Sequence, residues 1–301
     1  MSKRVLGLVI ATTLAVLSGC TAAEPSAPAT SAPATFASVQ PAKVTKLLVF
    51  VVENHSLDQM RTDMPYTAAL GKQFAVATNY RAVTHPSLPN YLAMTGGSTF
   101  AVADDGPPSS HPINQPSVFG QALSLGRTAK EYAEGMPANC SPDNSGRYAV
   151  KHNPWAYYVG ERASCARFDV PVDQLSADAA KGQLPDAGMV IPDLCNDAHD
   201  CELSAADQWL RTHIDAAMAG PDWHSGRLAI VVTADEDDHQ QDNLVLTVVA
   251  HPSLHGVVVT TPLTHYSLAR LYSEILGAGP LGEAASAPSM ATAFGLQLAA
   301  G

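Results

Sequence analysis

Short apolar runs alternate with helical patterns over most of this 301-residue chain. Five of the runs are rich in β-branched residues and are bounded by turn residues, a pattern typical of strands buried on both faces of a parallel sheet. They cover residues 46–52, 187–191, 228–233, 244–249 and 257–259. The run at 46–52 reads KLLVFVV and is almost wholly apolar, so we expect it at the centre of the sheet.

Stretches with apolar residues at helical spacing separate these runs. They cover residues 66–74, 91–94, 118–125, 205–218 and 265–276. Ser204 can cap the first turn of the longest stretch, and Asp207 suits the positive end of its dipole. Strands that alternate with helices predict the α/β class: a doubly wound, mostly parallel sheet with helices on both faces, in a single domain.

The N-terminal segment follows a different pattern. Lys3 and Arg4 precede an apolar run that ends in Leu17-Ser18-Gly19-Cys20. Residues 1–19 therefore have the features of a signal peptide, and their apolar run is too short for a stable membrane span. Small residues directly before a cysteine resemble a bacterial lipobox, in which Cys20 carries the lipid. An ordinary cleaved signal is the alternative.

Residues 20–44 are rich in Ala, Pro, Ser and Thr, which predicts a tether between the lipidated cysteine and a folded domain. We expect that domain at 45–285 and a C-terminal tail at 286–301. The protein is then an extracytoplasmic lipoprotein, anchored in a membrane through Cys20 at the cell surface or in the periplasm, with a released fraction.

Composition narrows the class of partner. An apolar fraction of 46% is sufficient for a sizeable core. The 17 basic and 28 acidic residues give a net charge of −11, which argues against a nucleic-acid partner because such proteins present a basic surface. We expect a monomer that acts on a small molecule.

Four cysteines remain after Cys20, an even number that suits disulfide formation in an oxidising compartment. Three pairings are possible, and proximity in the sequence favours Cys140 with Cys165 and Cys195 with Cys201. A zinc site is the alternative, although none of the spacings is that of C-x-x-C.

Polar residues follow three of the predicted strands. Glu53 and Asn54 follow the first, Asp197 comes shortly after the second, and the acids at 235–238 follow the third. The carboxyl ends of parallel strands meet at one edge of a sheet. Adjacent acids repel one another, so a single divalent cation is the simplest partner, and oxygen ligands favour Mg²⁺, Ca²⁺ or Mn²⁺ over Zn²⁺. A solvated acidic loop is the alternative.

A serine precedes the helical stretch at 91–94, in the segment His85-Pro86-Ser87-Leu88-Pro89-Asn90. Ser87 would lie at a helix N-terminus, where a phosphate group docks readily. Its hydroxyl becomes a competent nucleophile when a metal or a base lowers the hydroxyl pKa. Ordinary turn and cap chemistry for Ser87 or Asn90 is the alternative.

Five motifs occur in a fixed order: Glu53-Asn54-His55-Ser56, Thr84-His85-Pro86-Ser87-Leu88-Pro89-Asn90-Tyr91, Lys151-His152-Asn153-Pro154-Trp155, Asn196-Asp197-Ala198-His199-Asp200 and Asp235-Glu236-Asp237-Asp238. In these motifs the chain resembles the phosphoesterase family of bacterial acid phosphatases and phospholipases C, within the alkaline phosphatase superfamily. It is most similar to the secreted mycobacterial acid phosphatases, which act on phosphoinositides among other monoesters. The resemblance covers roughly residues 45–280.

The resemblance implies a metal-dependent acid phosphatase with a phosphoserine intermediate, in which Ser87 is the nucleophile and also a metal ligand. The other implied ligands are Glu53, Asn54, Asp235 and Glu236, while a contact from Asp237 or Asp238 is left open. The implied phosphate-binding or proton-donating histidines are His85, His152 and His199.

Four further residues are expected to bind the substrate or to orient such a histidine: Asn90, Lys151, Asp197 and His265. If the histidines act in the protonated form, activity should favour acidic pH. The alternatives are a phospholipase C-type phosphodiesterase and a surface lipoprotein that binds phosphate or metal without turnover.

Overall fold

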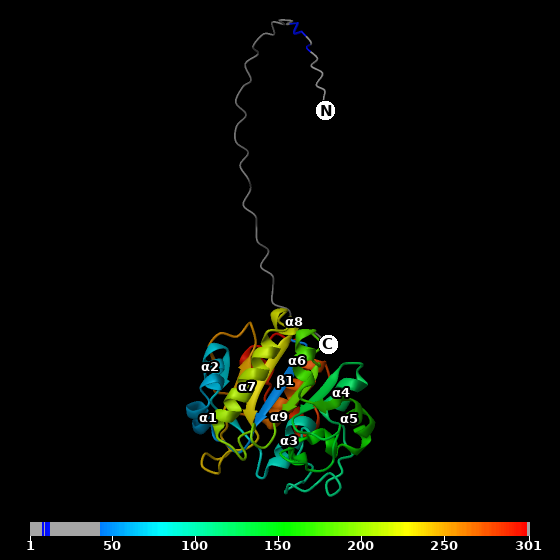
Figure 1. Cartoon of the computed structure of the whole chain (residues 1–301). Coiled ribbons are helices and arrows are strands. Elements are labelled where there is room, and N and C mark those ends of the chain that lie inside the picture. Colours follow the sequence, from blue (N-terminus) through cyan, green and yellow to red (C-terminus); the bar gives the residue numbers. More distant parts are fainter. Residues whose placement is uncertain (1–7, 9, 13–42, 300–301) are drawn as a thin grey trace. The chain divides into compact units, whose positions relative to one another are not determined.

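A mixed sheet of eight strands forms the middle layer of the folded part, in the order β5-β4-β6-β1-β7-β8-β2-β9 (Figure 1). The computed structural model describes residues 8, 10–12 and 43–299. The expected signal peptide, Cys20 and nearly all of the tether lie outside the described residues. No helix in the described part is long and apolar enough to cross a membrane.

The strands of this sheet are β1 (Lys46–Val52), β2 (Ala75–Ala77), β4 (Ala129–Ala133), β5 (Asp169–Pro171), β6 (Ala187–Ile191), β7 (Leu228–Ala234), β8 (Thr247–Ala250) and β9 (Val257–Val259). A second, two-stranded sheet pairs β3 (Tyr80–Arg81) with β10 (Leu263–Thr264). The strand β1 pairs in parallel with both β6 and β7, and every residue from Leu47 to Val52 is buried. The central position predicted for this strand is confirmed.

Helices cover both faces of the sheet. One group of helices in mutual contact is α1 (Leu57–Asp63), α2 (Pro65–Gln73), α6 (Gln174–Ala180), α7 (Leu203–Met218) and α8 (Pro221–His224). The other is α3 (Ser87–Gly96), α4 (Val118–Ser124), α9 (His265–Leu276) and α10 (Met290–Phe294). Figure 1 shows α7 across β1, and α9 also contacts β1. The mostly parallel, doubly wound α/β fold is therefore confirmed.

Short elements connect these layers on the side of β4 and β5. They are α5 (Arg162–Phe168) and the 3-10 helices η1 (Val150–His152), η2 (Pro154–Tyr157) and η3 (Val159–Glu161), with η4 (Gly282–Ala285) near the C-terminal end. Disulfides join Cys140 to Cys165 and Cys195 to Cys201. The favoured pairing is thus confirmed.

The last predicted long strand differs from the structure in its start and its direction. β8 begins at Thr247 rather than at residue 244, and it runs antiparallel to β7. Leu244 instead forms a bridge with Arg81, and the Val245 N–H donates to the Tyr80 carbonyl at 3.0 Å. The apolar pattern identified a buried segment but could not locate the bend within it.

Two expectations about helix caps are wrong in the same region. α7 begins at Leu203 with Glu202 at its N-cap, so Ser204 does not cap it. The Asp207 carboxylate accepts hydrogen bonds from the backbone N–H groups of Tyr66 and Thr67 at 2.8 and 2.9 Å. These are free N–H groups in the first turn of α2, so Asp207 stabilises the neighbouring helix rather than its own.

The C-terminal segment is not a separate tail. Met290 and Phe294 of α10 are buried in the core, and Leu298 forms a parallel bridge with Val44. The folded unit therefore extends past the boundary expected at residue 285, because apolar side chains spaced along this segment find a surface to cover.

Candidate active site

The serine of the predicted nucleophile segment is the first residue of α3, and Pro86 is its N-cap. Ser87 is buried, and its Oγ donates a hydrogen bond of 2.6 Å to Glu53 Oε1. The hydroxyl therefore points at the end of β1 and makes no hydrogen bond that would cap its own helix.

Asn90 holds the segment that precedes Ser87. Its Oδ1 accepts hydrogen bonds from the backbone N–H groups of Val83 and Thr84 at 3.0 and 3.1 Å. Its Nδ2 donates to the Thr84 carbonyl at 2.7 Å and to Glu236 Oε2 at 3.1 Å. The polar atoms of the amide are therefore engaged with this segment and with Glu236, whereas we expected Asn90 to bind the substrate.

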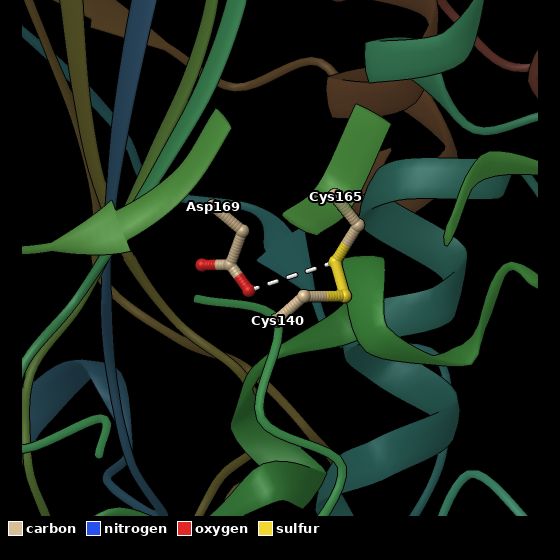
Figure 2. Close-up of side chains that lie close together, drawn as sticks. All are labelled: Cys140, Cys165 and Asp169. Atoms are coloured by element: carbon tan, nitrogen blue, oxygen red, sulfur yellow. Dashed lines mark hydrogen bonds between the residues drawn. A yellow bond between two sulfur atoms is a disulfide. The ribbon is translucent and has the colours of Figure 1, made fainter. Parts of the chain in front are cut away.

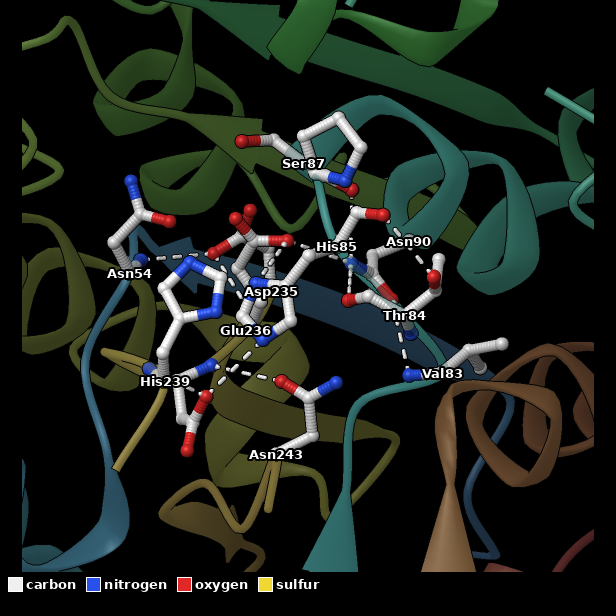
Figure 3. A network of polar contacts seen from close by, with 12 residues as sticks. Asn54, Val83, Thr84, His85, Ser87, Asn90, Asp235, Glu236, His239 and Asn243 are labelled. Atoms are coloured by element: carbon white, nitrogen blue, oxygen red, sulfur yellow. Dashed lines mark hydrogen bonds and ion pairs between the residues drawn. The ribbon is translucent and has the colours of Figure 1, made fainter. Parts of the chain in front are cut away.

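The residues that follow β1 and β7 meet because these strands are neighbours in the sheet, and Figure 3 shows Asn54 beside Asp235. Asn54 has a φ of 56°, a left-handed conformation that asparagine tolerates better than most residues. In this conformation its backbone N–H donates to Asp235 Oδ1 at 3.0 Å, and the Glu236 N–H donates to the same oxygen at 2.7 Å. Glu53, Asp235 and Glu236 are all buried.

The chemistry of this donor set fits a hard divalent cation. Glu53 Oε2 and Asp235 Oδ2 are buried and make no hydrogen bond. Burial and the charge of Glu53 raise the pKa of Glu236 to about 8, and the same two causes raise the pKa of Asp235 well above its usual range. A cation would relieve this repulsion, and all the expected ligands lie at one edge of the sheet: Glu53, Asn54, Ser87, Asp235 and Glu236.

Two basic side chains reach the cluster from η1. Lys151 Nζ lies 3.2 Å from Ser87 Oγ and 3.3 Å from Glu53 Oε1. His152 Nε2 lies 3.0 Å from Glu53 Oε1, and its Nδ1 lies 3.1 Å from Asp197 Oδ2. Burial lowers the pKa of His152, but the two carboxylates outweigh this effect and raise the pKa to about 9. Positive charge is therefore held beside the serine.

His199 lies at the edge of a cavity of about 820 Å³, which His55 and Asp200 also line. Its side chain is 33% exposed, and its Nδ1 lies 2.7 Å from Asp200 Oδ1. Its ring centroid is 6.3 Å from that of His152. The imidazole is therefore partly solvated and lies beside His152, a position suited to proton transfer.

His85 is directed at the acidic loop rather than at the serine. Its Nδ1 lies 3.2 Å from Glu236 Oε2, its Nε2 lies 3.2 Å from Asp237 Oδ1, and its ring stacks on His239. Asp237 also accepts a hydrogen bond from the His239 N–H, so this carboxylate stabilises the loop to which both residues belong. Within the described residues the His85 ring makes no hydrogen bond to Ser87, whereas we expected a catalytic histidine here.

His265 lies against the backbone of Asp235, on the buried side of the site. Its Nε2 donates to the Asp235 carbonyl at 2.6 Å, and its Nδ1 accepts from the Tyr80 hydroxyl at 3.1 Å. Burial lowers the pKa of His265 to about 4, so the ring is neutral and does not conflict with the helix dipole. Both nitrogens are used, so the expected substrate role is replaced by support of the Asp235 backbone.

Asp105 is a site residue that the motifs did not reveal. Its Oδ1 accepts from the Leu88 N–H at 3.0 Å, and its Oδ2 lies 3.3 Å from Lys151 Nζ. It thereby links the lysine to the helix that begins with Ser87. In the sequence it precedes Gly106 in a loop, where an acid is ordinary turn chemistry, so no signal distinguished it.

The chain is similar in sequence to proteins named as phosphatases. The chain is 30% identical over 256 residues to the phosphatidylinositol-3-phosphatase of Mycobacterium tuberculosis, covering 83% of this chain and 82% of that protein. It is 31% identical to an acid phosphatase of Aspergillus fumigatus and 28% identical to a phosphate-repressible acid phosphatase of Penicillium chrysogenum, covering 71% of this chain in both cases. The chain spans only about half the length of these fungal relatives, 51% and 54%.

Solved structures with low sequence identity share the fold. A protein of the alkaline phosphatase superfamily from Vibrio parahaemolyticus aligns with a TM-score of 0.57 at 13% identity, covering 79% of this chain and 68% of that chain. A lipoteichoic acid synthase from Listeria monocytogenes aligns with a TM-score of 0.51 at 10% identity, covering 81% and 76%. The profile of the Phosphoesterase family matches residues 58–268, and the chain belongs to that family.

Proposed function

We propose that this chain is a metal-dependent acid phosphatase that hydrolyses phosphate monoesters through a phosphoserine intermediate. The observation that carries the proposal is the position of the Ser87 hydroxyl, 2.6 Å from Glu53 at the start of α3 and 3.2 Å from the Lys151 ammonium. A nucleophile needs an acceptor for its proton, and a phosphate ester needs positive charge beside it. Both are present at one serine.

The proposed ligands of one divalent ion are Glu53, Asn54, Ser87, Asp235 and Glu236. When bound, such an ion would lower the pKa of the serine hydroxyl and neutralise charge on the phosphate oxygens. The oxygen atoms of the five proposed ligands favour Mg²⁺, Ca²⁺ or Mn²⁺ over Zn²⁺. The buried oxygens of Glu53 and Asp235 that lack hydrogen bonds support this assignment.

Lys151, His152 and His199 have separate roles in the proposed reaction. Lys151, held by Asp105, attracts the phosphate group to Ser87. His152 is fixed between Glu53 and Asp197, so it orients Glu53 and adds positive charge. His199 has a carboxylate partner in Asp200 and partial exposure to solvent, so it gives a proton to the leaving alcohol.

A chromogenic phosphate monoester, assayed with each divalent metal in turn, tests the proposal. We expect turnover in wild type, and a phosphate group on Ser87 that can be trapped by acid quench of the reaction with a radiolabelled substrate. Phosphate affinity without phosphate release under any of these metals would instead identify a binding lipoprotein.

The substrate class is a small phosphate monoester or a phosphoinositide. The similarity to a phosphatidylinositol-3-phosphatase supports the second possibility. Parallel assays on a soluble monoester, a phosphatidylinositol 3-phosphate vesicle and a choline phosphodiester separate the alternatives. Cleavage of the diester alone would identify a phospholipase C-type enzyme.

We further propose an extracytoplasmic location with a lipid anchor at Cys20. The two disulfides support an oxidising compartment. Metabolic labelling with a radioactive fatty acid should mark the wild-type protein but not a Cys20→Ala variant. Equal labelling of the two proteins would exclude the anchor at this residue.

A further inference from the structure

A second pair of buried acids lies away from the serine, on the neighbouring strands β4 and β5. Glu131 and Asp169 are partners in the parallel register, and both are fully buried. Side chains of register partners project from the same face of a sheet, and adjacent strands lie only about 4.8 Å apart. The two carboxyl groups are therefore side by side in the core, in a segment where the five motifs contribute no acid.

The hydrogen bonds around this pair are incomplete. The Trp155 N–H donates to Glu131 Oε2 at 3.3 Å, and Asn153 Nδ2 donates to Asp169 Oδ2 at 2.8 Å. Glu131 Oε1, Asp169 Oδ1 and Asn153 Oδ1 are buried and have no hydrogen-bond partner. Three acceptors without a donor in one place indicate a missing proton, because a protonated carboxyl group can donate where a carboxylate cannot.

No cation in the described part of the chain forms an ion pair with either acid. The titratable groups that face the pair are the uncharged phenols of Tyr148, Tyr158 and Tyr272, whose pKa values the two acids help to raise. The basic residues of α5, Arg162 and Arg167, are exposed to solvent. Two adjacent charges would therefore remain uncompensated in the core, which is far more costly than a shared proton.

Asn153 and Trp155, which donate hydrogen bonds to the pair, belong to the segment that also carries Lys151 and His152. Asn153 directly follows His152, and Trp155 lies in η2, which continues the same turn. The Cys140–Cys165 disulfide lies beside Asp169, with Cys165 Sγ 3.7 Å from Asp169 Oδ2 (Figure 2). The pair is thus placed to fix the backbone of residues 150–157 from behind.

We propose that Glu131 and Asp169 share one proton, and that this carboxylic acid–carboxylate pair is a positioning element that holds Lys151 and His152 toward Ser87. Loss of the proton at alkaline pH leaves two charges side by side and weakens the hold on residues 150–157. The inference rests on the proposed function for the role of that segment, whereas the shared proton itself does not depend on it.

The direction of the pH effect follows from the acids. Burial raises the pKa of Asp169 to about 7, and burial together with the Asp169 charge raises the pKa of Glu131 well above its usual range. A carboxyl group with a raised pKa in the folded state stabilises that state fully below its unfolded pKa of about 4. For Asp169 this stabilisation is lost as the pH rises through about 7, whereas Glu131 keeps the shared proton to higher pH.

Infrared spectroscopy of the whole protein tests the shared proton without any assay of activity. The Mn²⁺-loaded protein is used, so that Asp235 and Glu236 are engaged as the proposed ligands. At about pH 8, above the pKa of about 7 of Asp169 and with Glu131 still protonated, we expect the carbonyl stretch of one protonated carboxyl group in wild type. The stretch should be absent from a Glu131→Gln variant. Glu161→Gln is the matched control, because Glu161 accepts from Trp155 Nε1 at 2.8 Å but has no neighbouring acid in register. Absence of the band in wild type, or its persistence in both Glu131→Gln and Asp169→Asn, would overturn the proposal.

The pH profile of kcat/KM tests the positioning role. Glutamine keeps a donor at every pH, so Glu131→Gln should shift the alkaline limit of activity upward by about one pH unit, while Glu161→Gln leaves that limit in place. An unchanged limit in Glu131→Gln, with the infrared band lost, would exclude the positioning role. If wild type shows no turnover, the proposed function fails, and the infrared result still decides whether the proton is shared.

Discussion

Glu53 and Asp235 at the ends of β1 and β7 can be compared with Glu131 and Asp169 within β4 and β5. Both groups are fully buried carboxyls on neighbouring parallel strands. The first group lies where loops begin, so Lys151 and His152 can reach it. The second is buried on β4 and the outermost strand β5, and receives only neutral donors.

The difference shows how position within a strand decides the way in which a buried charge is compensated. At the carboxyl edge, long polar side chains and an ion can approach from the loops, so carboxylates persist and can act as ligands. At the buried pair on β4 and β5 no cation of the described residues approaches, and a proton is the remaining partner. The predictions below test the two halves of this comparison.

The largest effect should come from Ser87→Ala. Removal of the nucleophile should reduce turnover of a chromogenic phosphate monoester by on the order of 10³-fold or more, with the fold intact by circular dichroism. Ser124→Ala, on the exposed end of α4, is the control and should behave as wild type. Near-normal turnover in Ser87→Ala would exclude the proposed mechanism.

Loss of a proposed metal ligand should come next. Glu53→Gln or Asp235→Asn should weaken Mn²⁺ binding, measured by calorimetry, by at least about 100-fold, the upper range for loss of an outer-shell partner. A chelator should abolish the activity of wild type, and added divalent metal should restore it. Glu131→Gln should bind Mn²⁺ as wild type does, because its carboxyl is not at the strand ends. Equal loss in all three variants would contradict the division between the two groups.

His199→Gln should have an effect that depends on the leaving group. Alkyl phosphates need a proton for the departing alkoxide, so their kcat should fall by about 100-fold, whereas nitrophenyl phosphate should lose much less. Asp200→Asn should show the same pattern more weakly, since Asp200 orients the imidazole. A uniform loss with both substrates would assign His199 to binding rather than to proton transfer.

The smallest effect concerns stability at the second pair. At alkaline pH, once the shared proton is lost, the Glu131→Gln variant should be more stable than wild type, on the order of 1–2 kcal/mol, because the amide removes the repulsion between two carboxylates. Thermal unfolding followed across pH measures this difference, which should vanish below about pH 4, where both acids are protonated even in the unfolded chain. A constant difference at every pH would point to packing instead.

Local patterns in the sequence were sufficient for the main elements. The run at 46–52 is apolar at nearly every position, and only a strand covered on both faces accommodates that. In contrast, β4 reads AKEYA and β5 reads DVP, so charged residues hid both strands from a search for apolar runs. Glu131 and Asp169 are themselves among those residues.

The roles of single side chains were harder to predict. An acid near a helix N-terminus stabilises the free N–H groups there, and Asp207 does so. The helix whose N–H groups it accepts from, however, lies 140 residues away in the chain. His265 and Asn90 belong to the site region by sequence, and yet their polar atoms are consumed by backbone groups. Such contacts depend on which segments meet, and a motif does not contain that information.

By itself, the sequence determined the α/β alternation, the acids that follow each central strand, and the serine at the start of a helix. These features depend on residues close together in the chain, whose spacing sets their direction. Only the tertiary structure decided that Lys151 meets both Ser87 and Asp105, that His85 faces Asp237, and that Glu131 lies against Asp169. Sheet order and register bring these groups together from distant segments, and burial then sets the charge that each one can carry.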